Sequence, residues 1–322
     1  MRTATTARLE IIGPLPVPTR RERWRRTVAR DLTRNKHVYL MLLPVLLYYL
    51  VFHYVPMYGA AIAFQDFNPV KGILGSKWVG LQNFQDFFSS FYFSRLIFNT
   101  IAINILDLVF GFPAPIILAL LINELRWNPF KRLVQTVTYL PHFISVIVVV
   151  GMLFDFLARD GLVNQILATP DPIAFMQSPD WFRQLYVGSG IWQHVGWGSI
   201  VYLAAIATID PQLYDAAKVD GANRFQQIWH ITIPGILATI VILLILRMGS
   251  LMSVGYEKII LMYNPLTYET ADVISTYVFR RGILQADFSF SAAVGLFNSV
   301  INFGLLLAAN RISRRLTEHS LW

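Results

Sequence analysis

The sequence contains no cysteine among its 322 residues. Disulfide bonds and cysteine-ligated metal sites are therefore excluded. The six histidines are scattered and form no His-Glu-x-x-His pattern, so the sequence offers little basis for another kind of metal site. It also lacks Gly-x-x-x-x-Gly-Lys-Ser/Thr, the loop that cradles nucleotide phosphates. We expect the chain to bind no cofactor itself, and any step powered by ATP must use the ATPase of another polypeptide.

Charged residues are also scarce. They make up 14 % of the chain, while hydrophobic residues make up 55 %. Soluble domains average about 25 % charged and roughly 45–50 % apolar residues. A soluble protein would have difficulty keeping this much apolar surface away from water, so the composition favours a membrane protein.

Hydrophobic runs indicate an all-α membrane protein with six transmembrane helices. A helix needs roughly 20 mostly apolar residues to cross a hydrocarbon core of about 30 Å. The six stretches that meet this requirement are approximately 38–64, 96–122, 133–158, 187–208, 234–255 and 289–309. Membrane helices tolerate proline where neighbours satisfy the freed carbonyls, so we expect kinked rather than broken helices. The prolines in these stretches include Pro44, Pro56, Pro113, Pro115 and Pro141.

The distribution of Lys and Arg predicts the orientation. With the N-terminus inside, the cytoplasmic segments contain 18 of these residues and the outer loops 8, and Arg247 lies within the fifth stretch. The positive-inside rule requires this sense, so both termini are expected to be cytoplasmic. The chain then divides into a basic N-terminal arm (1–37), a six-span domain (38–309) and a C-terminal tail (310–322). The arm has the composition of a segment that contacts anionic lipid headgroups, and no nucleic acid partner is expected.

A polar loop at about 209–233, between the fourth and fifth stretches, is the most informative segment. Taken alone, it could be an ordinary connector or a docking element whose acids pair with basic groups of a partner. Gly221 would allow a turn, and Pro234 suits the first turn of the next helix, where its missing N–H costs nothing. Its characteristic residues are Asp215, Ala216, Ala217, Asp220, Gly221, Ala222, Ile231, Ile233 and Pro234.

This loop resembles the cytoplasmic signature of permeases from binding-protein-dependent ABC importers. Other segments resemble carbohydrate importers, in particular permeases for polysaccharide fragments, a subgroup that includes the bacterial alginate importer. Those segments are Asn123–Leu125, Tyr139–Pro141, Ile209–Tyr214 and Gly295–Ser299. The small departures from the pattern are Asp215, where many relatives have Glu, and Ile233, where Leu is common.

The resemblance implies an ABC importer type I permease fold in the bacterial inner membrane. It also implies that the loop forms a short helix docked on a separate ATPase. The expected complex contains a second permease, two ATPase subunits that bind ATP and Mg, and an extracytoplasmic solute-binding protein that delivers oligosaccharide.

The resemblance further implies that the fourth and fifth spans line the substrate path. The matching positions are Gln193, His194, Trp197 and Arg247. The Trp197 indole could stack on a sugar ring while Gln193 and His194 bind hydroxyls. Alternatively, Trp197 is an interfacial anchor and His194 a hydrogen-bonded packing residue.

Arg247 lies about 20 Å beyond Pro234 along a helix that rises 1.5 Å per residue. A charge inside the bilayer is costly and marks a functional candidate. Its guanidinium could bind the carboxylate of a uronate sugar bidentately, or it could form a buried ion pair with Asp107 of the second stretch. The sequence leaves both interpretations open.

Other membrane protein classes fit less well. A secondary transporter without an ATPase partner is the main alternative, but no convincing internal repeat is present and Asp107 is a lone candidate for ion coupling. No catalytic pair stands out in the spans, so we expect a transport subunit rather than an enzyme. A channel would more naturally repeat a pore-lining motif.

Overall fold

The chain is almost entirely helical in the computed structural model, which describes residues 24, 31, 33–168 and 170–316. It divides after Gly59 into two units, and each is described by itself. Most of the predicted basic arm and the last residues of the predicted tail lie outside the described residues.

The first unit contains a continuous helical run. Its elements are α2 (Lys36–Tyr49), the π-helical turn η1 (Leu50–Tyr54) and α3 (Val55–Met57). The run continues into the 3-10 helix η2 (Tyr58–Phe64), so the first predicted span is helical throughout.

The second unit begins with a short antiparallel pair of strands, β1 (Gln65–Asp66) and β2 (Lys77–Trp78), in which Gln65 pairs with Trp78. Its first helices are α4 (Gly72–Gly75), α5 (Gln82–Phe88), α6 (Phe93–Leu106), η3 (Asp107–Gly111), α7 (Pro113–Glu124), α8 (Asn128–Tyr139), η4 (Leu140–Phe143), α9 (Val146–Phe156), α10 (Leu162–Leu167), η5 (Phe175–Gln177) and α11 (Pro179–Ile206). The later ones are α12 (Pro211–Val219), α13 (Arg224–Gln227), η6 (Ile228–Thr232), α14 (Ile233–Gly235), α15 (Leu237–Met248), α16 (Tyr256–Met262), α17 (Tyr268–Ala271), α18 (Ile274–Phe279), η7 (Arg280–Leu284) and α19 (Phe288–Leu316).

The same irregular helical turn precedes three of the prolines. A π-helical turn ends two residues before Pro56, Pro113 and Pro234, in η1, η3 and η6 respectively. Proline lacks an N–H and its ring clashes with the carbonyl four residues earlier. In the wider π-helical turn, a backbone N–H bonds to the carbonyl five residues earlier instead of four. The Phe112 N–H, for example, donates to the Asp107 carbonyl at 3.0 Å. The helical runs continue through Pro56 and Pro113 without a break, as expected.

The expectation of kinked rather than broken helices was wrong for the third predicted span. Between η4, which contains Pro141, and α9 the chain bends by 100°. Ser145 caps the start of α9 by accepting a hydrogen bond from the Val148 N–H. Gln193 of α11 donates its side-chain N–H to the Ile144 carbonyl at 2.8 Å. Because these polar side chains satisfy the freed backbone groups, the break is tolerated.

The fifth predicted span is bent by 60° at Ile236. Pro234 lies near the end of a helical run that begins at Arg224, not in the first turn of a new helix as predicted. The last helix also continues to Leu316, so the predicted tail from 310 starts as helix.

Among the described residues, three helices are long and apolar enough to cross a membrane, or five if each bent pair is one span. These correspond to the first, second, third, fifth and sixth predicted stretches. All but the last two residues of the fourth stretch lie in α11, a helix of 28 residues that is outside this count. It carries charged and amide side chains, including Asp180, Arg183 and Gln193, which lower its hydropathy.

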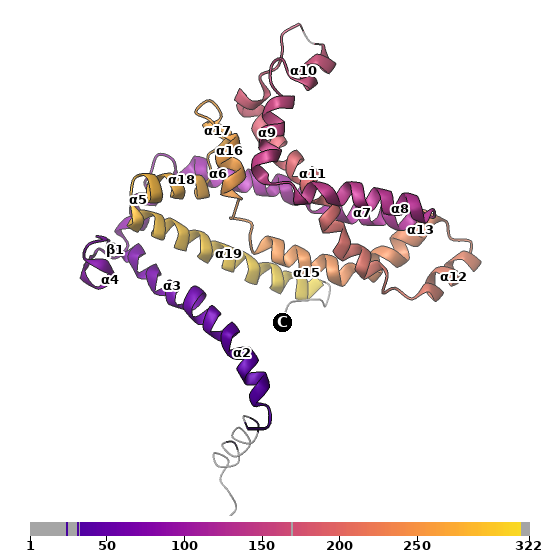
Figure 1. The fold of residues 1–322 in the computed structure, drawn as a ribbon, viewed down its shortest axis with the longest axis horizontal. Coiled ribbons are helices and arrows are strands. Elements are labelled where there is room, and N and C mark those ends of the chain that lie inside the picture. Colours follow the sequence, from indigo (N-terminus) through magenta and orange to yellow (C-terminus); the bar gives the residue numbers. More distant parts are fainter. Residues whose placement is uncertain (1–23, 25–30, 32, 169, 317–322) are drawn as a thin grey trace, which may run out of the picture. The chain divides into compact units, whose positions relative to one another are not determined.

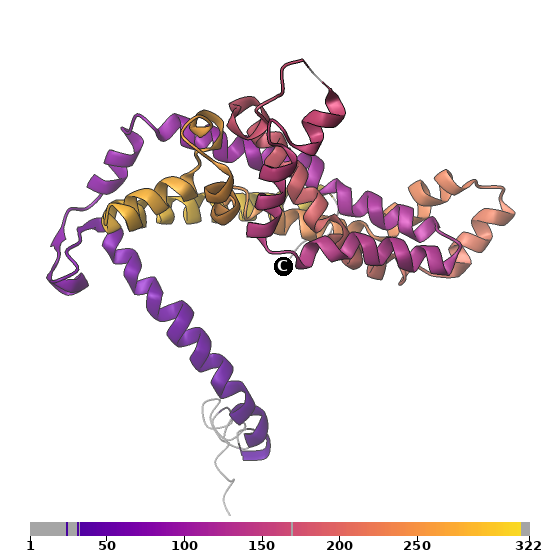
Figure 2. The ribbon, with the colours of Figure 1, turned by 45° about the horizontal axis from the view of Figure 1, so that its top comes forward.

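Helix α11 lies beside α7 and α8 in both views of the ribbon (Figures 1 and 2). A Cβ added at Gly196 would lie 2.0 Å from the Thr138 carbonyl oxygen of α8, and one at Gly198 would lie 3.1 Å from the Pro115 ring of α7. Small residues let helix backbones approach closely in membrane proteins. The two glycines therefore set the spacing of these three helices.

A buried ion pair stabilises the α17–α18 segment. Asp272 is fully buried, and Arg280 donates to both of its carboxylate oxygens at 2.9 and 2.6 Å. Burial opposes the charge on Arg280, but the bonds to Asp272 more than offset it and raise the pKa of the guanidinium. Asn99 of α6 donates to the backbone carbonyls of Glu269 and Asp272, so the segment is held against α6.

The glycine contact predicts that Gly196→Ala lowers the thermal unfolding midpoint of the detergent-solubilised chain. The added methyl group would collide with the α8 backbone, and overpacking of this kind costs about 1–3 kcal/mol. Gly188→Ala in the same helix is the control, because nothing lies within 4 Å of a Cβ at Gly188. Circular dichroism melts of both variants measure the difference. Equal midpoints would contradict the close approach.

Candidate functional site

The loop at 209–233 contains the short helix that its sequence signature predicted. Helix α12 forms because the Asp210 side chain caps it, accepting from the Gln212 N–H at 2.9 Å, and because Pro211 occupies its first turn. Gly221 ends the segment with a positive φ of 77°, a conformation that favours glycine. The predicted turn at this glycine is confirmed.

The predicted docking residues are presented on this helix and the turn after it. Asp215 and Ala216 are exposed on α12, and Asp220 lies just beyond its last turn. Asp215 forms an ion pair with Lys218 at 2.8 Å, and both side chains are largely in solvent. Exposed ion pairs contribute little to stability, so the Asp215 carboxylate can exchange Lys218 for another cation.

A hollow of about 300 Å³ lies against this turn. It is lined by Ala217, Asp220, Gly221, Ala222, Gln226, Gln227, His230 and Ile231. The same loop also exposes apolar side chains: Val219 is 88 % exposed, and the stacked rings of Phe225 and Trp229 have centroids 6.4 Å apart. The loop thus presents a hollow and exposed apolar groups.

One hydrogen bond connects the two ends of the loop, and one ion pair connects the loop to α7. The hydroxyls of Tyr214 and Thr232 lie 3.0 Å apart. Arg224 forms an ion pair with Glu124 at the end of α7, with 3.5 Å between Nη1 and Oε2. In Figures 1 and 2, α12 and α13 lie at the same end of the helices as the adjoining ends of α7 and α8. These contacts connect α12 to the helical run Arg224–Gly235, and that run to the end of α7.

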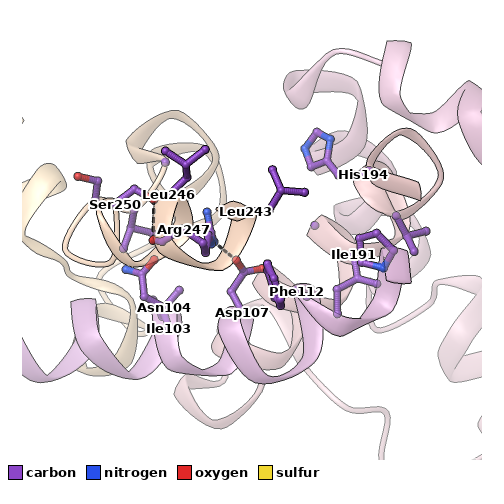
Figure 3. A pocket seen from close by; sticks show the side chains of 18 of the residues that line it. Ile103, Asn104, Asp107, Phe112, Ile191, His194, Leu243, Leu246, Arg247 and Ser250 are labelled. Carbon is purple, nitrogen blue, oxygen red and sulfur yellow. Dashed lines mark hydrogen bonds and ion pairs between the residues drawn. The ribbon is translucent and has the colours of Figure 1, made fainter. Parts of the chain in front are cut away.

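A cavity of about 620 Å³ lies among α6, α7, α11, α15 and the segment that follows α15 (Figure 3). Its lining residues are Ile103, Asn104, Asp107, Gly111, Phe112, Pro115, Tyr186, Gly190, Ile191, His194, Val195, Gly198, Val201, Tyr202, Leu243, Leu246, Arg247, Ser250, Ser253, Val254, Gly255 and Lys258. The walls are mainly apolar with a few polar and charged groups, the usual make-up of a small-molecule site.

The α11 wall of this cavity contains a row of residues four positions apart: Tyr186, Gly190, His194, Gly198 and Tyr202. A helix turns once every 3.6 residues, so successive members of the row lie about one turn apart and the row winds gradually around the helix. Of the predicted substrate-path residues on α11, only His194 belongs to the row.

The structure places Gln193 and Trp197 away from the cavity lining. Gln193 is buried, and its side chain donates a hydrogen bond to the Ile144 carbonyl at the helix break described above. Trp197 stacks on the His142 ring with centroids 4.5 Å apart and planes 4° apart. His142 in turn approaches His194, with 3.1 Å between their Nδ1 atoms. Trp197 is therefore linked to the cavity through His142 and His194.

Arg247 lines the cavity and forms an ion pair with Asp107 of η3 (Figure 3). The sequence left two partners open for Arg247, a uronate carboxylate and Asp107, and the structure shows the pair with Asp107. Gly111 leaves room for the pair, because a Cβ there would lie 2.5 Å from the Asp107 Oδ1. Both side chains are partly exposed to the cavity, at 38 % and 27 %, so the pair forms part of the cavity wall.

Lys258 of α16 is a cavity residue that the sequence analysis missed. Its Nζ donates to the Tyr186 carbonyl at 3.0 Å and lies 5.0 Å from the Tyr186 ring centroid. Burial lowers the pKa of this ammonium to about 8. Lys258 falls in a predicted outer loop. The only sequence feature that could have indicated a place in the cavity is its position a few residues beyond the fifth hydrophobic stretch.

Metal ligation finds no support in the part of the chain that the structure describes. No group of three or more His, Asp or Glu side chains there could hold a metal ion.

Comparisons with known proteins agree with this architecture. The family described as "Binding-protein-dependent transport system inner membrane component" matches residues 111–318. Protein LplB of Bacillus subtilis (strain 168) is 47 % identical over 294 residues, which cover 90 % of this chain and 92 % of LplB. The polygalacturonan/rhamnogalacturonan transport system permease protein YteP of the same organism is 44 % identical over 301 residues, covering 92 % of this chain and 94 % of YteP.

A solved structure is similar as well. It is the crystal structure of a bacterial ABC transporter involved in the import of the acidic polysaccharide alginate. One of its chains matches with a TM-score of 0.84 and 45 % identity, over 90 % of this chain and 99 % of that one. A second structure of such a transporter, in complex with an alginate pentasaccharide-bound periplasmic protein, matches with the same TM-score.

The family predicted from the loop signature is confirmed, and so is the all-α permease fold. The matched region covers more than half of the sequence, and the similarity to a solved importer extends over nearly all of it. The chain belongs to the family of inner membrane components of binding-protein-dependent transport systems, the permeases of ABC importers.

Proposed function

We propose that this chain is one of two permeases in an ATP-driven importer that carries acidic oligosaccharides across the bacterial inner membrane. Both termini face the cytoplasm, and a solute-binding protein delivers the sugar from outside. The support comes from the relatives: YteP is named for polygalacturonan and rhamnogalacturonan transport, and the matching solved transporters import alginate. Polygalacturonan and alginate are both polymers of uronic acids.

Coupling to ATP uses the loop at 209–233. The observation that carries this assignment is the exposed α12 helix beside a hollow of about 300 Å³, in a loop that Arg224 joins to Glu124 at the end of α7. Two ATPase subunits bind ATP and Mg, and one of them receives α12. Asp215 and Asp220 then pair with basic groups of that subunit, and Gly221 and Ala222 let its backbone approach closely. Through the Arg224–Glu124 ion pair and the helical run that contains Thr232, movement of the ATPase moves α7 and the helices after Thr232.

The sugar passes the cavity of about 620 Å³. His194 supplies a ring nitrogen, and the guanidinium N–H groups of Arg247 that face away from Asp107 donate to sugar oxygens. Trp197, half exposed beside His142, offers a ring face at the edge of the path. Gln193 contributes indirectly, by holding the break at Ile144 that shapes this wall.

Composition of the complex is the first test. Mild solubilisation from native membranes followed by mass spectrometry should recover a second permease and an ATPase together with this chain. Recovery of this chain alone, in an assay shown to preserve such complexes, would favour a secondary transporter and contradict the proposal.

The docking assignment predicts that Asp215→Lys uncouples uptake from ATP hydrolysis while the chain remains inserted. A like charge placed against a basic groove is repelled, so uptake should fall about tenfold or more. Lys218→Ala is the matched control, because it removes the partner of Asp215 but keeps the carboxylate. Uptake and ATP hydrolysis are measured in parallel in proteoliposomes. Normal uptake by the Asp215→Lys variant would refute the docking role.

The cavity assignment predicts that Arg247→Ala weakens uptake of acidic oligosaccharides more than uptake of neutral ones. The substitution removes a donor and leaves the Asp107 carboxylate unpaired in the cavity, where it repels a uronate. The double variant Asp107→Asn/Arg247→Ala removes that repulsion and should recover part of the acidic uptake. Equal losses for acidic and neutral sugars in both variants would show that the pair is only structural.

A further inference from the structure

The charges of the 620 Å³ cavity do not balance. Its ionised side chains are Asp107, Arg247 and Lys258, and His194 adds a titratable ring. Arg247 and Asp107 neutralise each other in their ion pair. Among the residues that the structure describes, no carboxylate lies within 4.0 Å of the Lys258 ammonium. The cavity therefore keeps one positive charge, on Lys258.

Lys258 is held in place but left open on one side. Its Nζ donates one hydrogen bond, to the Tyr186 carbonyl, and lies over the Tyr186 ring. An ammonium has three N–H donors, so two remain for another partner. On the α11 wall, Gly190 has no side chain to cover the nitrogen: a Cβ there would lie 3.6 Å from Nζ.

An uncompensated ammonium in this position is costly for the protein. Partial burial disfavours the charged form of an ammonium that lacks a counter-charge, and one backbone carbonyl with a ring face offsets only part of that cost. The buried carboxylate of Asp272, in contrast, is bonded to Arg280 and Thr276. A half-buried cation that lines a cavity and lacks an ion pair is suited to an anion that enters the cavity.

We propose that Lys258 binds a carboxylate of the transported oligosaccharide and thereby makes the permease selective for acidic sugars. The inference rests on the proposed function and adds the residue that selects the substrate. Asn104, Ser250 and Ser253 line the same cavity and supply hydrogen-bonding groups for hydroxyls. A compact ammonium with rotatable donors can follow a carboxylate that moves along the path, whereas the Arg247 guanidinium is fixed by Asp107.

The test uses the whole importer that co-purifies with this chain, reconstituted in proteoliposomes. It compares uptake of uronate oligosaccharides with uptake of the same oligosaccharides after reduction of their carboxyl groups to alcohols, each saturating its binding protein. The variants are Lys258→Gln, which removes the charge, and Lys258→Arg, which keeps it. Lys71→Gln is the matched control, because Lys71 is exposed and lies outside the cavity lining.

We expect Lys258→Gln to lower the ratio of acidic to neutral uptake by about ten- to a hundredfold, the range of one charge-assisted hydrogen bond. Lys258→Arg should retain most of the ratio and Lys71→Gln all of it. An unchanged ratio in Lys258→Gln would overturn the role of Lys258 and leave the proposed function intact. A wild-type importer that takes up neither sugar in the presence of ATP would instead refute the proposed function.

A second readout does not depend on transport. Acylation of Lys258 in the wild-type complex, quantified by mass spectrometry, should be slowed by uronate oligosaccharides and not by their reduced forms. This distinguishes carboxylate binding from a structural role, which no added sugar would affect. Equal protection by both sugars would place Lys258 beside the path without selecting the carboxylate, and would overturn the inference.

Discussion

The approach of α11 to α7 and α8 is the contact on which the rest of this unit depends. With no side chain at Gly196, the α11 backbone lies directly against the carbonyl of Thr138. Only at this distance can Gln193 reach the Ile144 carbonyl and satisfy the break before α9. The same rotation of α11 turns Gly190 and His194 toward the cavity. One packing constraint therefore shapes both the broken helix and the cavity wall.

Charged side chains are paired differently in the cavity wall and in the packed interior around Asp272. Asp272 is fully buried, and its carboxylate accepts hydrogen bonds from Arg280 and Thr276. Such a saturated pair suits a structural role, because breaking it would leave a charge in low dielectric. The cavity instead holds Arg247 paired with a partly exposed Asp107, and Lys258 paired with no carboxylate among the described residues. Incomplete satisfaction is what distinguishes groups that can bind a ligand.

Sequence patterns predicted the elements whose causes are local. Apolar runs located the spans because the bilayer requires them, and the α12 helix and the turn at Gly221 followed from residues within one loop. Other features depend on distant contacts. The break at Ile144 needs a donor from α11, and Lys258 reaches the cavity only because α16 folds back against Tyr186. Gln193 and His194 are neighbours in sequence, yet about 100° of helix rotation puts only one of them in the cavity.

The contacts around α12 connect the loop to both sides of the Arg247–Asp107 pair. On one side, Tyr214 bonds to Thr232, and the helical run from there leads through the bend at Ile236 to Arg247. On the other, Arg224 bonds to Glu124 at the end of α7, whose opposite end joins the π-helical turn that carries Asp107. The first route contains the 60° bend at Ile236 and the second contains the π-helical turn η3, and helices bend at interruptions of this kind. A displacement of α12 would therefore reach the two halves of the pair through separate helices.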